Sequence, residues 1–320
     1  MSCSKLHLIN NMGAGGAQST IRTIVASNNV FVLHGSKGQK IWKLLRVIQN
    51  SKTKMHLICW LYHASLVGCL IKLCFRDKII LSLNIRNGYA NPKDIKFSTR
   101  FIVSLVSILS AGIECRVNFC SEQSITEHNC KGLFKKSNNN VVYNGIEQPS
   151  RIYTKNDFIV CIVARYEPQK NYKLVKETLP WFHKHQVALH ILTDKKEELS
   201  KFLNFHDSDF LKVYDNSEIS ALEIMEISTH HMLLSSSEGF ANVNLEALSR
   251  GCSLICTNVG DSKIFPNEWC TIVPSNASEI LKNLNYIREK YDKKSFNDEL
   301  EKKKSYMISN FPLKNECDYV

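Results

Sequence analysis

The chain has 320 residues, of which 44% are hydrophobic and 22% charged, and its formal net charge is +11. This composition excludes a disordered, collagen-like or fibrous protein, and the length suits two domains. Residues 1–150 contain 19 Lys and Arg against 6 Asp and Glu, a net +13, whereas residues 151–320 contain 22 against 24, a net −2. We therefore expect the first half to face an anionic partner: nucleic acid, membrane lipid or a phosphorylated substrate.

The first half alternates short apolar strands with helices. Strands are predicted at residues 6–9, 30–33, 55–59, 79–83, 117–120 and 141–142, and helices from Ala17, at 41–47, at 64–75, at 97–113 and after Ser121. This alternation predicts a parallel, doubly wound sheet. Residues 55–75 are long enough to span a membrane, but His56, His63 and Lys72 interrupt the apolar run, which favours a buried strand at 55–60, a short turn and a helix at 64–75 instead.

The second half repeats the pattern after a polar, turn-rich stretch at 148–157, which predicts a linker. Strands are expected at 158–163, 188–193, 210–213, 231–234 and 253–257, and helices at 173–185, 195–203, 217–228, 242–250 and 278–291. We therefore predict one Rossmann-like domain at 1–150, a second at 151–292, and a charged, partly helical tail at 293–320. Two such domains predict a ligand cleft between them.

The twelve cysteines show no C-x-x-C spacing, and many lie in apolar runs, such as Cys59, Cys69, Cys74, Cys161 and Cys256. This pattern predicts buried free thiols in a reducing compartment rather than disulfides or a zinc site. The first residues do not have the pattern of a secretory signal. We therefore expect a cytoplasmic protein.

A glycine-rich loop at residues 11–18 joins the first strand to the first helix. Glycines let a backbone approach a phosphate or sugar closely, and the following helix offers backbone N–H groups. A dinucleotide site would also need an acidic residue about 20 positions further on. None occurs before Asp77, so NAD binding is not expected. The alternative is a tight strand–helix turn.

Two cations, Arg165 and Lys170, lie in the loop after the strand at 158–163. In that position they can converge on one diphosphate and stabilise a leaving phosphate as negative charge develops on it. The alternative is a pair of solvated surface cations.

The segment 235–251 follows another strand and contains a glycine loop and a helix start. Glu238 in the loop and Glu246 in the helix can accept hydrogen bonds from sugar and ribose hydroxyls. The helix N-terminus at residues 240–242 can donate backbone N–H groups to a phosphate. The alternatives are an ordinary acid near a helix cap and a solvated acid on a helix face.

The spacing of Glu238 and Glu246 resembles the E-x7-E signature of the retaining, GT-B-fold glycosyltransferases of family 4. Further matching pieces follow in the expected order: Gly15–Gln18, Trp60–Ala64, Val142–Glu147, Arg165 with Lys170 and Asn171, and Val259–Asp261. The resemblance covers about residues 1–285. It implies an α/β GT-B fold, in which two Rossmann-like domains face a central cleft.

The resemblance also implies roles for single residues. Arg165 and Lys170 would hold the donor diphosphate, and Glu238 would contact donor-sugar hydroxyls; these three form the expected catalytic group. Further donor contacts are expected from the ribose-binding Glu246, from the backbone of Gly239, Phe240, Ala241 and Asn242, and from Gly15 and Gly16. No metal or other cofactor is expected, because cations and a helix dipole take that role in the family.

The first half departs from the family pattern. Many relatives carry a histidine after the fourth strand, where this chain has Arg86, which can bind phosphate but cannot carry a proton near neutral pH. His63 either lines the cleft or is a buried core histidine. Asn144 is a further expected cleft residue.

The resemblance implies a retaining transferase of a hexosyl-type sugar. Its donor would be a nucleotide-diphosphate sugar, and its acceptor a lipid-linked or oligosaccharide glycan in bacterial surface polysaccharide, O-antigen or lipopolysaccharide synthesis. The basic first domain, including the helix at 41–47, would lie peripherally on the anionic inner face of the cell membrane. A merely solvated basic face is the alternative.

Two other classes of protein remain as alternatives. One is a non-catalytic GT-B protein that binds a nucleotide sugar or glycan. The other is a basic nucleic-acid-binding protein, although no nucleic-acid motif is present, so nucleic acid is not the expected partner.

Overall fold

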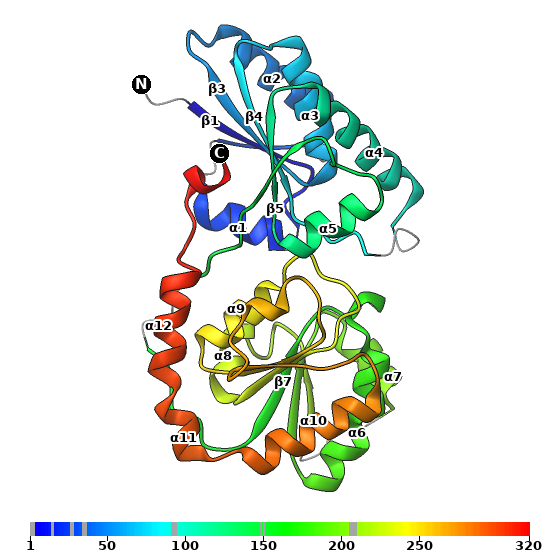
Figure 1. Ribbon diagram of the computed structural model, residues 1–320, viewed down its shortest axis with the longest axis vertical. Coiled ribbons are helices and arrows are strands. Elements are labelled where there is room, and N and C mark those ends of the chain that lie inside the picture. The colour runs from blue at the N-terminus through cyan, green and yellow to red at the C-terminus, as the bar shows by residue number, and fades with distance from the viewer. Residues whose placement is uncertain are drawn as a thin grey trace. The chain divides into compact units, whose positions relative to one another are not determined.

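The computed structural model describes residues 4–13, 16–25, 29–33, 37–90, 95–147, 149, 151–204 and 210–320 (Figure 1). The chain forms two compact units, one of Met1–Asn144 with Lys314–Val320 and one of Gly145–Leu313. Each unit contains a sheet of six strands flanked by helices. The predicted α/β class with two doubly wound parallel sheets is confirmed.

The first sheet has the strand order β2-β1-β3-β4-β5-β6, and every neighbouring pair is parallel. The strands are β1 Ser4–Ile9, β2 Val30–Val32, β3 Met55–Trp60, β4 Ile79–Ile85, β5 Cys115–Phe119 and β6 Asn138–Val141. All six residues of β3 are buried, which explains why its sequence is apolar apart from His56, since helices cover both faces of a parallel sheet.

The helices of the first unit are α1 Gly16–Ile24, α2 Lys37–Asn50, α3 Leu61–Cys74, α4 Phe97–Gly112 and α5 Glu122–Cys130. Figure 1 shows α2, α3 and α4 along one side of the sheet, with α1 on the other, as right-handed crossovers require for this strand order. Ser121 caps α5, because its hydroxyl accepts a hydrogen bond of 3.0 Å from the backbone N–H of Ser124.

The segment 55–75 forms β3 and α3, as predicted, but without the expected turn before residue 64. The helix begins at Leu61, whose positive φ of 67° turns the chain within one residue. In the part of the chain that the structure describes, no helix is long and apolar enough to cross a membrane.

The second sheet has the order β12-β11-β10-β7-β8-β9 and is also parallel. Its strands are β7 Ile159–Val163, β8 Ala188–Leu192, β9 Leu211–Tyr214, β10 His230–Leu233, β11 Ser253–Cys256 and β12 Cys270–Ile272. The helices beside it are α6 Tyr172–His185, α7 Lys196–Leu203, α8 Ala221–Ile227, α9 Asn242–Ser249 and α10 Ala277–Lys290. The sequence reading missed β12, because three residues are too few to show a pattern.

The boundaries of the compact units differ from the predicted domains 1–150, 151–292 and 293–320. The division falls after Asn144, and the expected tail is divided between the units. Helices α11 Lys293–Asp298 and α12 Leu300–Asn310 belong to the second unit, whereas the 3₁₀ helix η5 Glu316–Tyr319 belongs to the first. The Tyr319 ring is fully buried, with its centroid 4.9 Å from that of Trp60.

Buried lysines explain why two charged segments are parts of the fold. Lys303 of the expected tail donates hydrogen bonds to the carbonyl of Gly251 and the hydroxyl of Ser253, at 3.1 and 2.9 Å. Lys155 of the expected linker donates to the carbonyls of Met225 and Glu226 at the end of α8. In each case oxygen acceptors of the fold satisfy the buried ammonium group, and the Lys303 ammonium also lies 4.0 Å from the centre of the Phe296 ring.

The cysteines of the described residues are free thiols. Cys59, Cys69, Cys161 and Cys256 are buried as predicted, but Cys74 is exposed. It is the last residue of α3 and lies on the outer side of that helix, where Leu70 and Leu73 are also exposed, whereas Ile71 on the inner side is buried.

Candidate functional site

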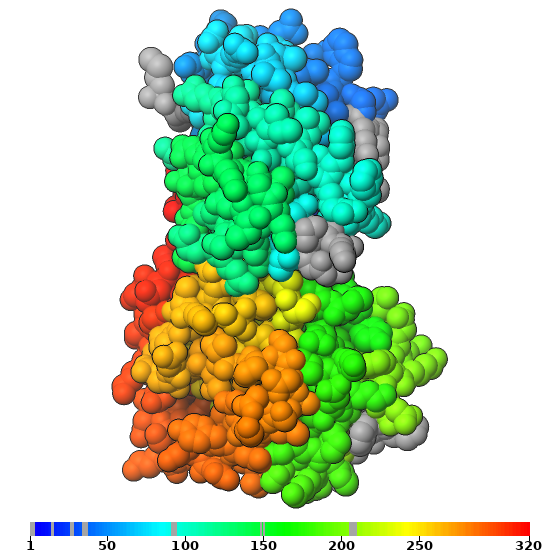
Figure 2. Space-filling model, turned by 45° about the vertical axis from the view of Figure 1, so that its right-hand side comes forward, coloured from blue at the N-terminus to red at the C-terminus, as the bar shows by residue number. Residues whose placement is uncertain are grey.

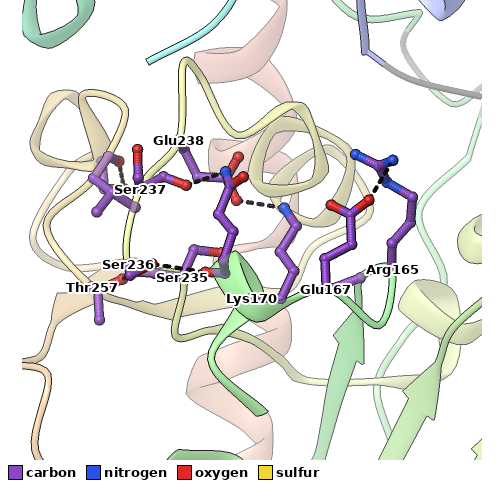
Figure 3. A network of polar contacts seen from close by, with 12 residues as sticks. Arg165, Glu167, Lys170, Ser235, Ser236, Ser237, Glu238 and Thr257 are labelled. Carbon is purple, nitrogen blue, oxygen red and sulfur yellow. Dashed lines mark hydrogen bonds and ion pairs between the residues drawn. The ribbon is translucent and has the colours of Figure 1, made fainter. Parts of the chain in front are cut away.

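Two loops of the second unit lie side by side at the carboxyl ends of neighbouring strands. The 3₁₀ helix η3 Pro168–Lys170 follows β7, and the loop 234–241 follows β10, which pairs with β7. Gln169 joins the loops, because its carbonyl accepts a 2.9 Å hydrogen bond from the Ser236 N–H and its side-chain amide donates to the Ser237 carbonyl (Figure 3). The protein's own bonds therefore fix the position of one loop on the other.

Lys170 and Glu238 are in direct contact across these loops. The Lys170 Nζ lies 2.5 Å from Glu238 Oε1, and the two side chains are only 14% and 11% exposed (Figure 3). Asn171 places the lysine by ending η3 in the left-handed conformation, with φ 53°, which asparagine tolerates better than most residues. A cation and a carboxylate predicted as catalytic therefore meet in a largely buried pair.

Arg165 lies on the same loop but has a different partner. Its Nη1 is 2.8 Å from Oε1 of Glu167, and the arginine side chain is half exposed. Figure 3 shows this pair beside the Lys170–Glu238 pair. A guanidinium carries five N–H donors, so one ion pair leaves others for an anion.

The Glu238 loop is supported from behind by the segment after β11. Gly260 has φ 55°, and a Cβ there would lie 2.9 Å from Glu238 Cβ and 3.1 Å from Phe240 Cα. The hydroxyl of Thr257 donates a 2.6 Å hydrogen bond to the Ser235 carbonyl. Glycine at 260 is therefore required both for its backbone conformation and for the space it leaves.

Helix α9 begins directly after the loop. Ala241 at its N-cap makes no side-chain capping bond, so the partial positive charge of the helix N-terminus lies next to Gly239, Phe240 and Asn242. Glu246 follows within the helix, where burial raises the pKa of its carboxyl and nearby Arg250 opposes part of that rise. The structure therefore gathers the predicted donor-binding residues of the second unit around one helix start.

The sequence reading missed a buried polar group beneath this loop. Ser235, His231 on β10 and Asn244 on α9 are fully buried. Burial lowers the pKa of His231 to about 3, and the Asn244 amide opposes part of the lowering, so the imidazole is neutral near pH 7. The sequence signal was the polar residues themselves, in stretches otherwise apolar.

The predicted residues of the first unit have more varied positions. The structure brings Arg86 and Asn144 together. Nη1 of Arg86 donates a 2.9 Å hydrogen bond to the backbone carbonyl of Val142, and Nη2 donates to the side-chain oxygen Oδ1 of Asn144. The guanidinium lies 5.3 Å from the centre of the Tyr319 ring. Gly16 begins α1, and Gly15 lies outside the described residues.

His63 is half-buried near the start of α3, so it is not a fully buried core histidine. The buried histidine of this region is His128. Its Nδ1 donates to the Ser124 carbonyl at 2.6 Å, so Nε2 is free to accept from the Tyr62 hydroxyl at 2.7 Å. Burial lowers the pKa of His128 to about 4.

The family of the second unit is shown by residues 146–302, which match the family model of the glycosyl transferases group 1. The second unit is a group 1 glycosyl transferase domain. The match includes the loops that carry Arg165, Lys170 and Glu238, and it confirms the predicted resemblance. Among the described ranges, no three His, Cys, Asp or Glu side chains are grouped as a metal site requires.

Solved structures show the same fold over nearly the whole chain. HepE of Anabaena, in complex with UDP, is 15% identical, with a TM-score of 0.71 over 96% of this chain and 95% of that one. Sucrose-phosphate synthase of Thermosynechococcus elongatus is 14% identical, with a TM-score of 0.74 over 97% and 95%. The lipopolysaccharide outer core galactosyltransferase WaaB is 15% identical, with a TM-score of 0.64 over 95% and 99%. The predicted GT-B fold is confirmed. No curated protein matches the sequence.

Replacing Gly260 with alanine is expected to lower the free energy of unfolding by about 1–3 kcal/mol, because the new methyl group must displace Glu238 or Phe240 from a strained turn. The same displacement is expected to weaken binding of a nucleotide sugar. Urea unfolding and calorimetric titration measure the two effects. Gly112→Ala is the control, since a Cβ there meets nothing within 4 Å. Equal stability and donor affinity in both variants would contradict the role of Gly260.

Proposed function

We propose that this protein transfers a hexosyl-type sugar, with retention of anomeric configuration, from a nucleotide-diphosphate sugar to a glycan acceptor. The observation that carries the proposal is the contact between Lys170 and Glu238, in a domain that matches the glycosyl transferases group 1. Gln169 joins the two loops that carry this pair, and helix α9 begins beside them. A sugar diphosphate needs three kinds of group. A cation and a helix N-terminus bind its phosphates, and a carboxylate accepts hydrogen bonds from its sugar hydroxyls.

In this proposal the donor exchanges partners with the resting ion pair. Lys170 leaves Glu238 for the diphosphate, and Glu238 accepts hydrogen bonds from the sugar hydroxyls. Arg165 and the N-terminus of α9 add positive potential at the leaving phosphate, which lowers the barrier as the glycosidic bond breaks. Glu246 accepts hydrogen bonds from the ribose hydroxyls. Lys170 thus has an anionic partner both before and after donor binding, and Glu238 has hydrogen-bond donors in both states.

Retention would follow if the acceptor hydroxyl attacks from the face that the diphosphate leaves. The bond from the sugar carbon to the phosphate oxygen breaks, the bond to the acceptor oxygen forms, and a leaving-phosphate oxygen takes the acceptor proton. Because cations and a helix N-terminus hold the diphosphate, we expect the reaction to proceed with neither metal nor organic cofactor. Transfer in excess EDTA tests this expectation.

The solved relatives indicate which donors to test first. HepE was crystallised with UDP and with UDP-glucose, and WaaB is described as a galactosyltransferase. We propose UDP-hexoses as the first donors and a lipid-linked or oligosaccharide acceptor of bacterial surface polysaccharide synthesis. The net +13 of residues 1–150 supports an enzyme that works peripherally at the anionic inner face of the membrane.

The test begins with a thermal-shift screen of nucleotide sugars, followed by transfer assays with lipid-linked and soluble oligosaccharide acceptors. We expect one donor to raise the melting temperature and to be consumed, with proton NMR showing that the new bond keeps the donor's anomeric configuration. An inverted product would refute retention. Donor binding without transfer or hydrolysis would identify a non-catalytic binding protein instead.

A further inference from the structure

Three helices on one face of the first sheet lack acidic residues altogether. Helices α2, α3 and α4 lie along the same side of the sheet (Figure 1). Their sequences contain six Lys and Arg and no Asp or Glu. An ordinary solvated surface mixes the two signs, so these helices carry an excess of positive charge, although Lys72 is buried and lies 3.9 Å from Glu114 just after α4.

Helix α4 is apolar on its outer side as well as its inner side. Phe97, Phe101 and Ile108 are 77%, 64% and 70% exposed, and their spacing of four and seven residues puts them on one side of the helix. The opposite side packs Val103 and Val106 into the core. The segment containing α4, in cyan, reaches the surface of the first unit in Figure 2. A helix that met only water would carry polar residues on its outer side.

Aromatic rings and arginines are paired on the same helices. On α2, Trp42 is 63% exposed and the Arg46 guanidinium lies 5.0 Å from its ring centre. On α4, the Arg100 guanidinium lies 5.5 Å from the ring centre of Phe97. Large rings beside cations are typical of helices that lie in the boundary between lipid headgroups and acyl chains.

We propose that the face formed by Trp42, Arg46, Phe97, Arg100, Phe101 and Ile108 lies flat on an anionic lipid surface. This α2–α4 face deepens the proposed function, because it rests on an enzyme that meets its acceptor at a membrane and names the surface that makes the contact. The rings enter the boundary layer, and the cations stay at the headgroup phosphates.

Charge favours a lipid surface over a second copy of the chain. In a symmetric dimer the same patch contacts itself, so the arginines of α2 and α4 would face the same positively charged patch on the other copy. No acidic residue on these three helices would be available to pair with them. Anionic headgroups supply that missing charge, and the acyl boundary accepts the exposed rings.

Tryptophan fluorescence provides a local readout on the full-length protein. Of the four tryptophans, Trp42 is exposed, whereas Trp60, Trp181 and Trp269 are buried. We expect vesicles of phosphatidylcholine with 30% phosphatidylglycerol to shift the emission to the blue and to co-sediment with the protein. Pure phosphatidylcholine vesicles should do so at least about tenfold more weakly, and added salt should weaken binding to the anionic vesicles. Equal binding to both vesicle types would overturn the proposal.

Paired variants distinguish binding through this face from non-specific hydrophobic binding to vesicles. Phe97→Ser with Phe101→Ser is expected to lower the vesicle partition coefficient at least about tenfold without lowering the melting temperature, since both rings are exposed. The control, Leu222→Ser with Tyr286→Ser, removes exposed apolar side chains from the second unit and should leave partition unchanged. Unchanged partition in the Phe97/Phe101 variant would refute the lipid surface. A dimer of the original protein that the variant dissociates would refute it as well, because the face would then bind a second copy.

Donor turnover measured without vesicles distinguishes failure of the proposed lipid-binding face from failure of the proposed transferase function. The Phe97/Phe101 variant should consume the donor with a soluble acceptor as fast as the original protein. If vesicle binding fails but this turnover persists, only the α2–α4 face is wrong. If the protein binds anionic vesicles but no donor is ever consumed, the proposed function is wrong.

Discussion

Lys170→Ala is expected to lower the rate of sugar transfer at least about 100-fold, with a smaller effect on the KM for the donor. The lysine Nζ lies 2.5 Å from Glu238 Oε1 in a pair that is nearly closed to water. Removing the cation leaves the developing charge on the diphosphate without its nearest stabiliser, and losses of this size follow when one such group is deleted from an enclosed site. It also leaves the Glu238 carboxylate buried without its partner.

Steady-state kinetics with a nucleotide sugar and acceptor check this result, and Glu238→Ala should show a loss of the same order. The matched control is Lys282→Ala, because Lys282 forms an exposed ion pair with Glu279 on α10. Removing that lysine should leave the rate unchanged. Near-normal transfer by both Lys170→Ala and Glu238→Ala would show that the active site lies elsewhere.

Lowering the pH from 7.0 to 5.5 is expected to lower the free energy of unfolding of each compact unit by about 4 kcal/mol, because six histidines of the described residues are buried in the neutral form. Burial lowers their pKa values to about 4 for His7, His56, His128 and His190, and to about 3 for His230 and His231. A free imidazole has a pKa near 6.5. The unfolded chain therefore takes up protons at a pH where the folded chain does not.

The direction of the pH dependence of stability follows from that difference in proton uptake. The stabilising effect of a neutral buried imidazole is complete above pH 6.5 and is lost as the pH falls from 6.5 toward 4. At pH 5.5 each histidine lowers the free energy of unfolding by about 1.4 kcal/mol. Each compact unit contains three of them, so each loses about 4 kcal/mol, a large part of the 5–15 kcal/mol that typically stabilises a domain.

Urea unfolding at pH 7.0, 6.0 and 5.5, followed by circular dichroism, measures this slope. His230→Phe should reduce proton uptake by about one, since the ring is enclosed by aromatic neighbours such as Phe158 and Phe296. The exposed His183 provides the control, and His183→Gln should leave the slope unchanged. A free energy of unfolding that stays constant from pH 7.0 to 5.5 would contradict neutral burial of these histidines.

Periodicity in the sequence was sufficient to predict most of the fold. The strand at 159–163 is a continuous apolar run, and the strand at 55–59 is apolar apart from His56, because both faces of a parallel sheet are covered. Their helices show one apolar stripe. Elements without that signal were missed or misplaced. The strand β6 is mostly asparagine, and β12 has only three residues. The segment 293–320 looks like a tail in the sequence, because its buried Lys303 cannot be distinguished there from its exposed lysines.

The second-unit part of the site was predictable because its residues follow strand ends, and carboxyl ends of neighbouring parallel strands meet at one edge. Arg165, Lys170 and Glu238 were named on that basis, and the structure brings them into adjoining pairs. The partners inside each pair were not predictable, since nothing in the spacing distinguishes Glu167 from Glu238 as the partner of Arg165. The bridge made by Gln169 depends on backbone carbonyls, which no residue pattern reveals.

The return of residues 314–320 to the first unit has a consequence for synthesis on the ribosome. The second unit is one uninterrupted stretch, so all of its sequence is available before the first unit has its last piece. The ring of Trp60 is covered by Tyr319, which is synthesised more than 250 residues later. The amino-terminal unit is therefore the last to be completed, contrary to the usual order in multidomain chains. A fragment ending at residue 144 would expose the apolar surface that Tyr319 covers, whereas the span 145–313 can be produced as a continuous polypeptide.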